Sequence, residues 1–282
     1  LGSTSVIAID KTGTITQAKM QIALLWAAKK ELAHDGKKFE VNLQNGEFES
    51  HLLLLKIAAL SNEAYIENPD DEIHEWIIRG RATDKALLSA SIGAGFLKHE
   101  LEKSEPKIDE LPFSSEHKYL ALLRKGALGE NILYVSGAPE RILAMAQFVA
   151  EDGNTAILEY EDRKKIYEKV AEMTGRGLRV VGLAYKKTSE ESIDKNDSQL
   201  RELVFVGCIG LKDPIREEAK ETVRLCHEAG LRLLLVTGDH KETARALMRE
   251  LGIRVEDNEI IEGGELEVMA DEELEKKITT IK

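Results

Sequence analysis

The sequence predicts an α/β protein in which a Rossmann-like domain with a parallel sheet is interrupted by an inserted α+β domain built on an antiparallel sheet. Two observations favour this fold class. A short apolar run at 6–9 and a strand–loop–helix repeat near the other end of the chain are typical of a doubly wound parallel sheet. The long stretch between them mixes helical periodicity with alternating, β-rich runs. We therefore expect one domain formed by residues 1–20 and 213–282, and an inserted domain formed by residues 21–212.

The parallel-sheet domain is predicted from strands and helices that alternate along the chain. Val6–Ile9 is a continuous apolar run, as expected of a strand buried on both faces. Apolar residues recur every three or four positions over Arg216–Ala229, and Pro214 just before this segment favours the start of a helix. Leu231–Val236 predicts a second buried strand, and an amphipathic pattern that ends before Gly252 predicts a second helix.

The inserted domain is predicted from a different mixture of segments. Helical periodicity covers residues 52–60, 84–93 and 162–174. Alternating or β-rich runs cover residues 119–124, 132–135, 178–185 and 203–209. Strands and helices that do not alternate regularly are typical of an antiparallel sheet with helices packed against it.

The composition narrows the class of function. Of the 282 residues, 43% are hydrophobic and 32% are charged, which is a globular composition and excludes disorder as the main state. The formal net charge of −12 argues against nucleic acid or an anionic membrane surface as the main partner. No apolar run approaches the roughly 18–20 residues that a transmembrane helix needs.

The residues that follow the first strand are suited to phosphoryl chemistry. Asp10 stands at the carboxyl end of that strand, where α/β sheets present ligands. Gly13 permits close approach, and backbone N–H groups with the hydroxyls of Thr12 and Thr14 suit a phosphoryl group. A carboxylate here can act as a nucleophile and form an acyl phosphate, with Mg²⁺ to neutralise the charge between two anions. The alternative is an aspartate that only caps a turn.

A resemblance to a known family rests on these residues and on four other strings. Asp10–Thr16 reads DKTGTIT and resembles the phosphorylation motif of the P-type cation-transporting ATPases. Further strings resemble motifs of that family in the same order: GAPE at 137–140, DPIR at 213–216 and TGD at 237–239. GRATDKALL at 80–88 is similar to a weakened nucleotide-domain motif. Together the strings resemble the calcium-pump-like subgroup, called type II.

The resemblance implies a haloacid-dehalogenase-type phosphorylation domain, incomplete here, with an inserted nucleotide-binding domain. Asp10 would take the γ-phosphoryl group of ATP, and its side chain and the Thr12 carbonyl would help to hold Mg²⁺. Closure of the two domains would bring the γ-phosphate to this aspartate. The other residues implied at the catalytic centre are Lys11, Thr237, Gly238 and Asp239.

The resemblance also implies an adenine nucleotide site in the inserted domain. Phe113 would stack on adenine, and Lys118 and Gly137 would line its pocket. Arg179 would reach the phosphates, and Asp84 would supply an acidic contact. Ordinary structural roles remain alternatives: a core phenylalanine, a solvated lysine, an ion-paired arginine on a strand and an acid favoured by a helix N-terminus.

The string DPIR at 213–216 resembles the hinge motif of the family, and several other positions depart from the family's pattern. Asp213 and Arg216 count among the nucleotide-binding residues by the same resemblance. Ser136 stands where a lysine is usual, and Ala18 where an asparagine is usual. Residues 253–282 contain no GDGxND segment, so we expect the chain to stop within the phosphorylation domain. We expect a soluble fragment from the cytoplasmic face of a membrane protein, with little turnover by itself.

Two other functions are alternatives to aspartyl phosphorylation in a cation pump. A stand-alone phosphatase of the haloacid-dehalogenase type, with a large cap, usually has a second acid two residues after the nucleophile. Thr12 occupies that position here, which argues against it. A non-catalytic nucleotide-binding module would follow from an incomplete Mg²⁺ site. The expected partners are ATP and, in the full-length protein, a transported cation that the sequence does not identify.

Overall fold

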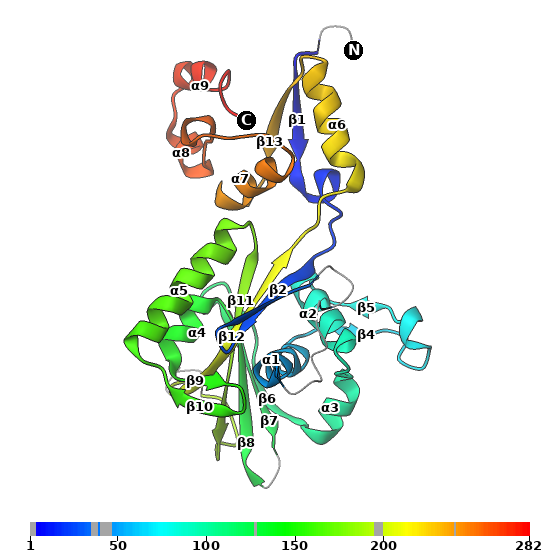
Figure 1. The fold of residues 1–282 in the computed structure, drawn as a ribbon, viewed down its shortest axis with the longest axis vertical. Helices are drawn as coiled ribbons and strands as arrows, with labels where there is room; N and C mark the ends of the chain where they lie inside the picture. Colours follow the sequence, from blue (N-terminus) through cyan, green and yellow to red (C-terminus); the bar gives the residue numbers. More distant parts are fainter. Residues whose placement is uncertain (1–3, 35–38, 40–46, 127–128, 195–199, 240) are drawn as a thin grey trace. The chain divides into compact units, whose positions relative to one another are not determined.

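The computed structural model describes residues 4–34, 39, 47–126, 129–194, 200–239 and 241–282. The chain divides into two compact units, both traced by chain colour in Figure 1. The smaller unit consists of Leu1–Lys19, Thr174–Leu178 and Asp213–Lys282. The larger unit consists of Met20–Met173 and Arg179–Lys212. The assignment of these units to a phosphorylation domain and a nucleotide-binding domain stays a prediction.

A mainly antiparallel sheet forms the centre of the larger unit. Its strands run in the order β10-β9-β12-β11-β8-β7-β6, and β2 pairs with β12 and with β3. All of these pairs are antiparallel except β12 with β9. The strands are β2 (Gln21–Ala27), β3 (Lys30–Ala33), β6 (Lys107–Leu111), β7 (Tyr119–Lys125), β8 (Asn131–Gly137), β9 (Ala146–Glu151), β10 (Asn154–Ile157), β11 (Arg179–Thr188) and β12 (Leu203–Lys212).

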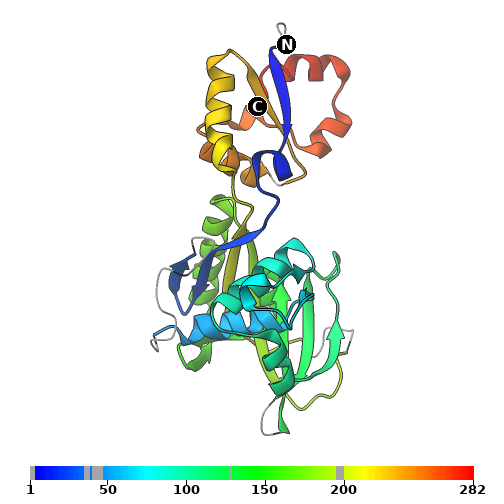
Figure 2. The same cartoon turned by 90° about the vertical axis from the view of Figure 1, so that its right-hand side faces the viewer.

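Helices cover both faces of this sheet, with α1 and α2 on one face and α4 and α5 on the other (Figures 1 and 2). The helices are α1 (Glu49–Leu60), α2 (Ala82–Gly93), α3 (Lys98–Ser104), α4 (Pro139–Met145) and α5 (Tyr160–Gly175). A small hairpin of β4 (Tyr65–Ile66) and β5 (Ile78–Arg79) precedes α2, with a 3₁₀ turn at Ile73–Glu75 inside it. The core lies between α1 and the sheet, where Leu54, Leu55 and Ile57 are fully buried.

The smaller unit contains a parallel strand pair with helices around it. Its strands are β1 (Val6–Asp10) and β13 (Arg232–Val236), and their register sets Asp10 opposite Val236. Its helices are α6 (Glu217–Glu228), α7 (Lys241–Glu250), α8 (Gly263–Val268) and α9 (Asp271–Lys277), with a 3₁₀ turn at Asp257–Glu259. Val223 of α6 and Met248 of α7 belong to one apolar cluster, against which the strands pack.

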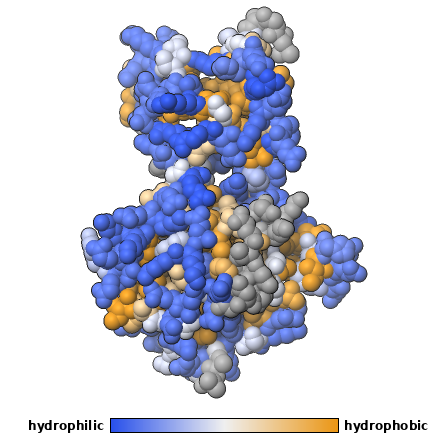
Figure 3. Space-filling model, viewed as in Figure 1, coloured by the Kyte–Doolittle hydropathy of each residue, from blue (hydrophilic) through white to orange (hydrophobic). Residues whose placement is uncertain are grey.

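The prediction that the first strand is buried on both faces is wrong for this structure. Ile7 and Ile9 pack against the apolar cluster, whereas Val6 points away from it and is 39% exposed. In the part of the chain that the structure describes, β1 pairs only with β13. The second face of this narrow sheet is therefore less covered by other elements than a strand in the middle of a wider sheet would be. Figure 3 shows apolar surface between hydrophilic edges in this unit.

None of the helices within the described ranges is both long enough and apolar enough to cross a bilayer.

Candidate functional site

Asp10 lies at the carboxyl end of β1, and its side chain is exposed. Because Asp10 is in register with Val236, Thr237–Asp239 follow directly from the end of the neighbouring strand. The two strings that the sequence carries near opposite ends of the chain therefore meet at one edge of a parallel sheet. This is the edge at which parallel sheets present ligands.

The turn after Asp10 is closed by short-range hydrogen bonds. Gly13 has a φ of +82°, a left-handed conformation that favours glycine. The backbone N–H of Thr16 donates to the Lys11 carbonyl at 3.1 Å. Arg216 donates to the Gly13 carbonyl at 2.9 Å. The turn is thus tied down on both sides while Thr12 stays exposed beside Asp10.

An ion pair joins the two strings at this sheet edge. The Lys11 ammonium contacts the Asp239 carboxylate, and the Lys11 side chain is only 13% exposed. The Asp239 backbone N–H donates to the Thr237 hydroxyl at 3.1 Å. Lys11 and Asp239 therefore orient one another, which fixes the loop after β13 relative to the turn after β1.

Asp213 and Arg216 have structural tasks within the same unit. Asp213 accepts hydrogen bonds from the hydroxyl of buried Thr16, at 2.6 Å, and from the Lys19 N–H, at 3.0 Å. The Arg216 N–H donates to the Ile15 carbonyl at 3.0 Å. These bonds join the segment after β1 to the segment before α6. The nucleotide contacts predicted for Asp213 and Arg216 stay predictions.

In the larger unit, two residues predicted to bind nucleotide, Phe113 and Asp84, both lie next to the guanidinium of Arg81. Phe113 follows β6 on an exposed loop, and its side chain is 40% exposed. The Arg81 Cζ lies 5.7 Å from the centre of the Phe113 ring. The Arg81 Nε lies 3.3 Å from Oδ2 of Asp84, and its guanidinium also pairs with Glu63. Phe113 and Asp84, predicted from different strings, therefore share a neighbourhood.

Gly137 is required by the close approach of its neighbouring strand. It pairs with Tyr119, and a Cβ at this position would lie 2.4 Å from the Lys118 carbonyl oxygen. That same oxygen accepts a hydrogen bond from the Ala138 N–H at 2.8 Å. Lys118 itself has a φ of +62°, which is unusual for a residue with a side chain. The exposed Lys118 side chain thus leaves from a tightly defined turn beside Gly137.

Arg179 opens β11, and its side chain is exposed. Strand β11 pairs with β8 through Gly182 and Gly137. Arg179 therefore stands on the strand next to the one that ends at Gly137. The structure supports its place near that strand end, and the predicted contact with phosphates stays a prediction.

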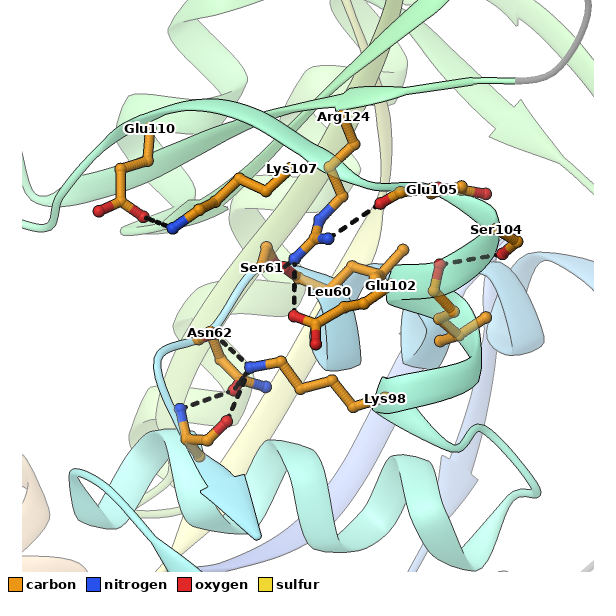
Figure 4. Close-up of polar contacts among 12 residues, drawn as sticks. Leu60, Ser61, Asn62, Lys98, Glu102, Ser104, Glu105, Lys107, Glu110 and Arg124 are labelled. Carbon is orange, nitrogen blue, oxygen red and sulfur yellow. Dashed lines mark hydrogen bonds and ion pairs between the residues drawn. The ribbon is translucent and has the colours of Figure 1, made fainter.

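Figure 4 shows a polar network in which Lys98 and Arg124 contact the segment from Leu60 to Asn62 and its neighbours. The Lys98 ammonium donates to the carbonyl oxygens of Asn62 and Ala64, at 2.9 and 2.7 Å. Arg124, which is 2% exposed, donates to the Leu60 carbonyl at 3.0 Å. Burial lowers the pKa of Lys98. Arg124 therefore binds a carbonyl oxygen of the last residue of α1, and Lys98 binds two carbonyl oxygens of the loop that follows, which includes Glu63.

Comparison with known proteins decides the family. A family model described as P-type ATPase, cytoplasmic domain N, matches residues 51–218, which is more than half of the chain. The chain belongs to the P-type ATPase family. The matched region contains Arg81, Phe113 and Gly137.

The relatives that match most of this chain are named as ATPases that transport cations. The chain is 34% identical to a cation-transporting ATPase of Synechocystis, over 97% of this chain and 31% of that protein. It is 32% identical to calcium-transporting ATPase 1 of Bacillus cereus, over 99% of this chain and 30% of that protein. It is 32% identical to the sodium/potassium-transporting ATPase α subunit of Tetronarce californica, over 93% of this chain and 27% of that protein. The chain spans about a third of the length of these relatives.

Sequence reasoning missed one residue that lies beside the predicted nucleotide residues Phe113 and Asp84. Arg81 lies inside the GRATDKALL string, but nothing in the string shows that its guanidinium reaches the Phe113 ring. The sequence did offer one signal: an arginine three residues before Asp84, a spacing at which opposite charges can pair on a helix.

Asp84 gives this P-type ATPase chain a testable pH dependence. Burial raises the pKa of the Asp84 carboxyl, and the nearby Arg81 offsets only part of that rise. A raised pKa in the folded state favours folding below the unfolded pKa, and this contribution is lost as the pH rises through the folded pKa. We expect the Asp84→Asn variant to gain in free energy of unfolding, relative to the parent, from acid toward neutral pH.

Urea unfolding at pH values from about 3 to about 7 measures this difference. Asp70→Asn, which alters an exposed aspartate of the same unit, is the matched control and should follow the parent curve. A constant offset between Asp84→Asn and the parent across this range would contradict the prediction.

Proposed function

We propose that this chain is the ATP-binding and aspartyl-phosphorylation region of an ATPase that couples ATP hydrolysis to cation transport across a membrane. The observation that carries the proposal is the sheet edge at which Asp10 and the TGD string meet, joined by the ion pair of Lys11 with Asp239. An exposed carboxylate at the end of a parallel strand, beside a second polar loop, suits attack on a phosphoryl group.

In the proposed reaction, a carboxylate oxygen of Asp10 attacks the γ-phosphorus of ATP. A new P–O bond forms, and the bond to the oxygen bridging the β- and γ-phosphates breaks. ADP leaves with the electron pair of that bond, and water later releases phosphate from the aspartyl phosphate. Thr237 and Gly238 would clamp the phosphoryl group, while Lys11 keeps Asp239 oriented.

The residues at this edge fit a Mg²⁺ ion by the chemistry of their donors. Asp10 offers an exposed carboxylate, and Thr12 offers a backbone carbonyl on an exposed turn. Mg²⁺ prefers oxygen ligands and is commonly held by one or two carboxylates together with substrate phosphates and waters. When bound, the ion would neutralise charge between the carboxylate and the phosphate. Asp10 and Thr12 are the residues proposed to hold it.

The finer classification belongs to the same proposal. We infer a haloacid-dehalogenase-type phosphorylation domain from the parallel pair β1 and β13 with Asp10 at its end. The nucleotide-domain strings favour the calcium-pump-like subgroup, and several relatives are named calcium-transporting ATPases. The proposed place of action is the cytoplasmic face of a membrane. A stand-alone phosphatase is less well supported, because Thr12 occupies the position of the usual second acid.

Binding of adenine nucleotide by the larger unit is the first test. Replacing Phe113 with alanine removes the stacking surface, and base–aromatic stacking is worth about 1–3 kcal/mol. We expect the dissociation constant for ATP, measured by calorimetry, to rise roughly 5- to 150-fold. Tyr160→Ala removes another exposed aromatic ring of the same unit and should leave ATP binding unchanged. Equal affinities for the parent and Phe113→Ala would argue against the proposed base site.

A further inference from the structure

The Phe113 ring is already covered by a side chain of the same chain. The Arg81 Cζ stands 5.7 Å from the ring centre, in a cation–π contact. A base stacked between the ring and the guanidinium would need about 7 Å, because each stacked contact takes about 3.5 Å. A base on this face of Phe113 and Arg81 in its present place are therefore mutually exclusive.

Arg81 resembles a purine base in the contacts that it makes. A guanidinium is flat, stacks on aromatic rings and presents N–H donors in its own plane. Arg81 lies over Phe113 while its Nε lies 3.3 Å from the Asp84 carboxylate. Phe113 is the residue proposed to stack on the base, and Asp84 is the residue proposed to supply an acidic contact to the nucleotide.

The anchor of Arg81 is fixed, whereas its side chain has room to leave. Gly80, just before it, has a φ of +134° and packs so closely on Ala64 that an added Cβ would lie 3.0 Å from the Ala64 Cα. Lys98 in turn holds the Ala64 carbonyl at 2.7 Å. The Arg81 side chain is 52% exposed, and the side chain of its partner Glu63 is 48% exposed. Movement into solvent therefore meets no packed core.

We propose that Arg81 occupies the base site of the nucleotide-free chain and is displaced from Phe113 when a purine nucleotide binds. The proposal rests on the proposed function, since it takes Phe113 as the stacking surface for the base. Displacement breaks the contact with Phe113 and loosens the contact with Asp84, so Arg81 weakens nucleotide binding.

Calorimetry with three probes tests this role: ATP, adenosine and inorganic tripolyphosphate. In Arg81→Ala we expect the affinities for ATP and adenosine to rise about two- to fivefold, the ratio that matches an exposed cation–π contact. Tripolyphosphate, which has no base, should bind the variant no more tightly than the parent. Arg79→Ala is the matched control, because Arg79 is 54% exposed, pairs with Glu67 and lies two residues away.

Glu63→Gln provides a second variant that keeps the arginine. It removes the negative charge of Glu63 and so weakens one tether of Arg81, and ATP and adenosine should again bind more tightly than they bind the parent. Weaker binding of ATP and tripolyphosphate by Arg81→Ala would overturn the proposal, because Arg81 would then be a phosphate contact. Unchanged adenosine affinity in both Arg81→Ala and Glu63→Gln would overturn it too.

The Phe113→Ala variant separates this proposal from the proposed function. If Phe113→Ala loses ATP affinity while Arg81→Ala gains none, the base site stands and the displacement of Arg81 fails. If neither the parent nor Arg81→Ala binds ATP, and Phe113→Ala behaves in the same way, the proposed function itself fails.

Discussion

Replacing Asp10 with asparagine is expected to abolish the acid-stable phosphoprotein formed from ATP labelled at the γ-phosphate. The amide has nearly the same shape as the carboxylate but is uncharged and a far weaker nucleophile. Loss of the attacking group typically lowers turnover by a factor on the order of 10⁴–10⁶. The side chain is exposed at the end of β1, so we expect little change in folding. Labelling in the presence of Mg²⁺, followed by acid quench, measures the effect.

The control for this experiment is another exposed acid of the smaller unit. Asp271→Asn alters the first residue of α9 and should leave labelling at the parent level. Asp10→Asn should still bind ATP, because Phe113 and its neighbours are untouched. Label retained by Asp10→Asn at the parent level would assign the nucleophile to a different side chain and remove the basis of the proposed function.

Replacing Arg124 with methionine is expected to cost the larger unit about 3–5 kcal/mol of unfolding free energy, as loss of one partner from a buried charged network does. Arg124 is 2% exposed and donates to the carbonyl oxygens of Leu60 and Glu105, both at 3.0 Å. Its guanidinium also pairs with Glu102 at 3.3 Å, as Figure 4 shows. Methionine fills much of the volume but leaves these buried oxygens without a donor.

Thermal unfolding measures this loss, and the midpoint should fall by roughly 6–20 °C for a unit of this size. Arg79→Met removes an exposed arginine that pairs with Glu67, so it should change the midpoint very little. If Arg124→Met unfolded at the same midpoint as Arg79→Met, the buried contacts of Arg124 would make no net contribution to the stability of the larger unit. Because Leu60 precedes the loop of Glu63, Arg124→Met should also weaken the hold on that loop.

Several elements were predictable because their signals are local. The apolar periodicity of Arg216–Ala229 indicated α6, and the structure has a helix over Glu217–Glu228. The β-rich runs at 119–124 and 203–209 are likewise strands β7 and β12. Strand β2, which reads QIALLWA at 21–27, was not predicted, since a short apolar run does not by itself distinguish a strand from a helix.

The exposure of β1 was not predictable from its own residues. An apolar run states that a strand can be buried on both faces, but its neighbours in space decide whether it is. In the described residues β1 has one neighbouring strand, and Val6 remains 39% exposed. The same limit applies to Asp84, whose raised pKa follows from burial that no sequence pattern at Asp84 reveals.

By itself, the sequence determined the order of the strings, the elements on which they lie and the family that they resemble, because these depend on residues close together in the chain. Only the tertiary structure decided that Lys11 pairs with Asp239 and that Arg81 lies over Phe113. Such pairs join residues far apart in sequence, and their contact depends on strand register and side-chain packing. Lys11 and Asp239 follow the ends of β1 and β13, so a change in the register of these two strands would move their loops apart.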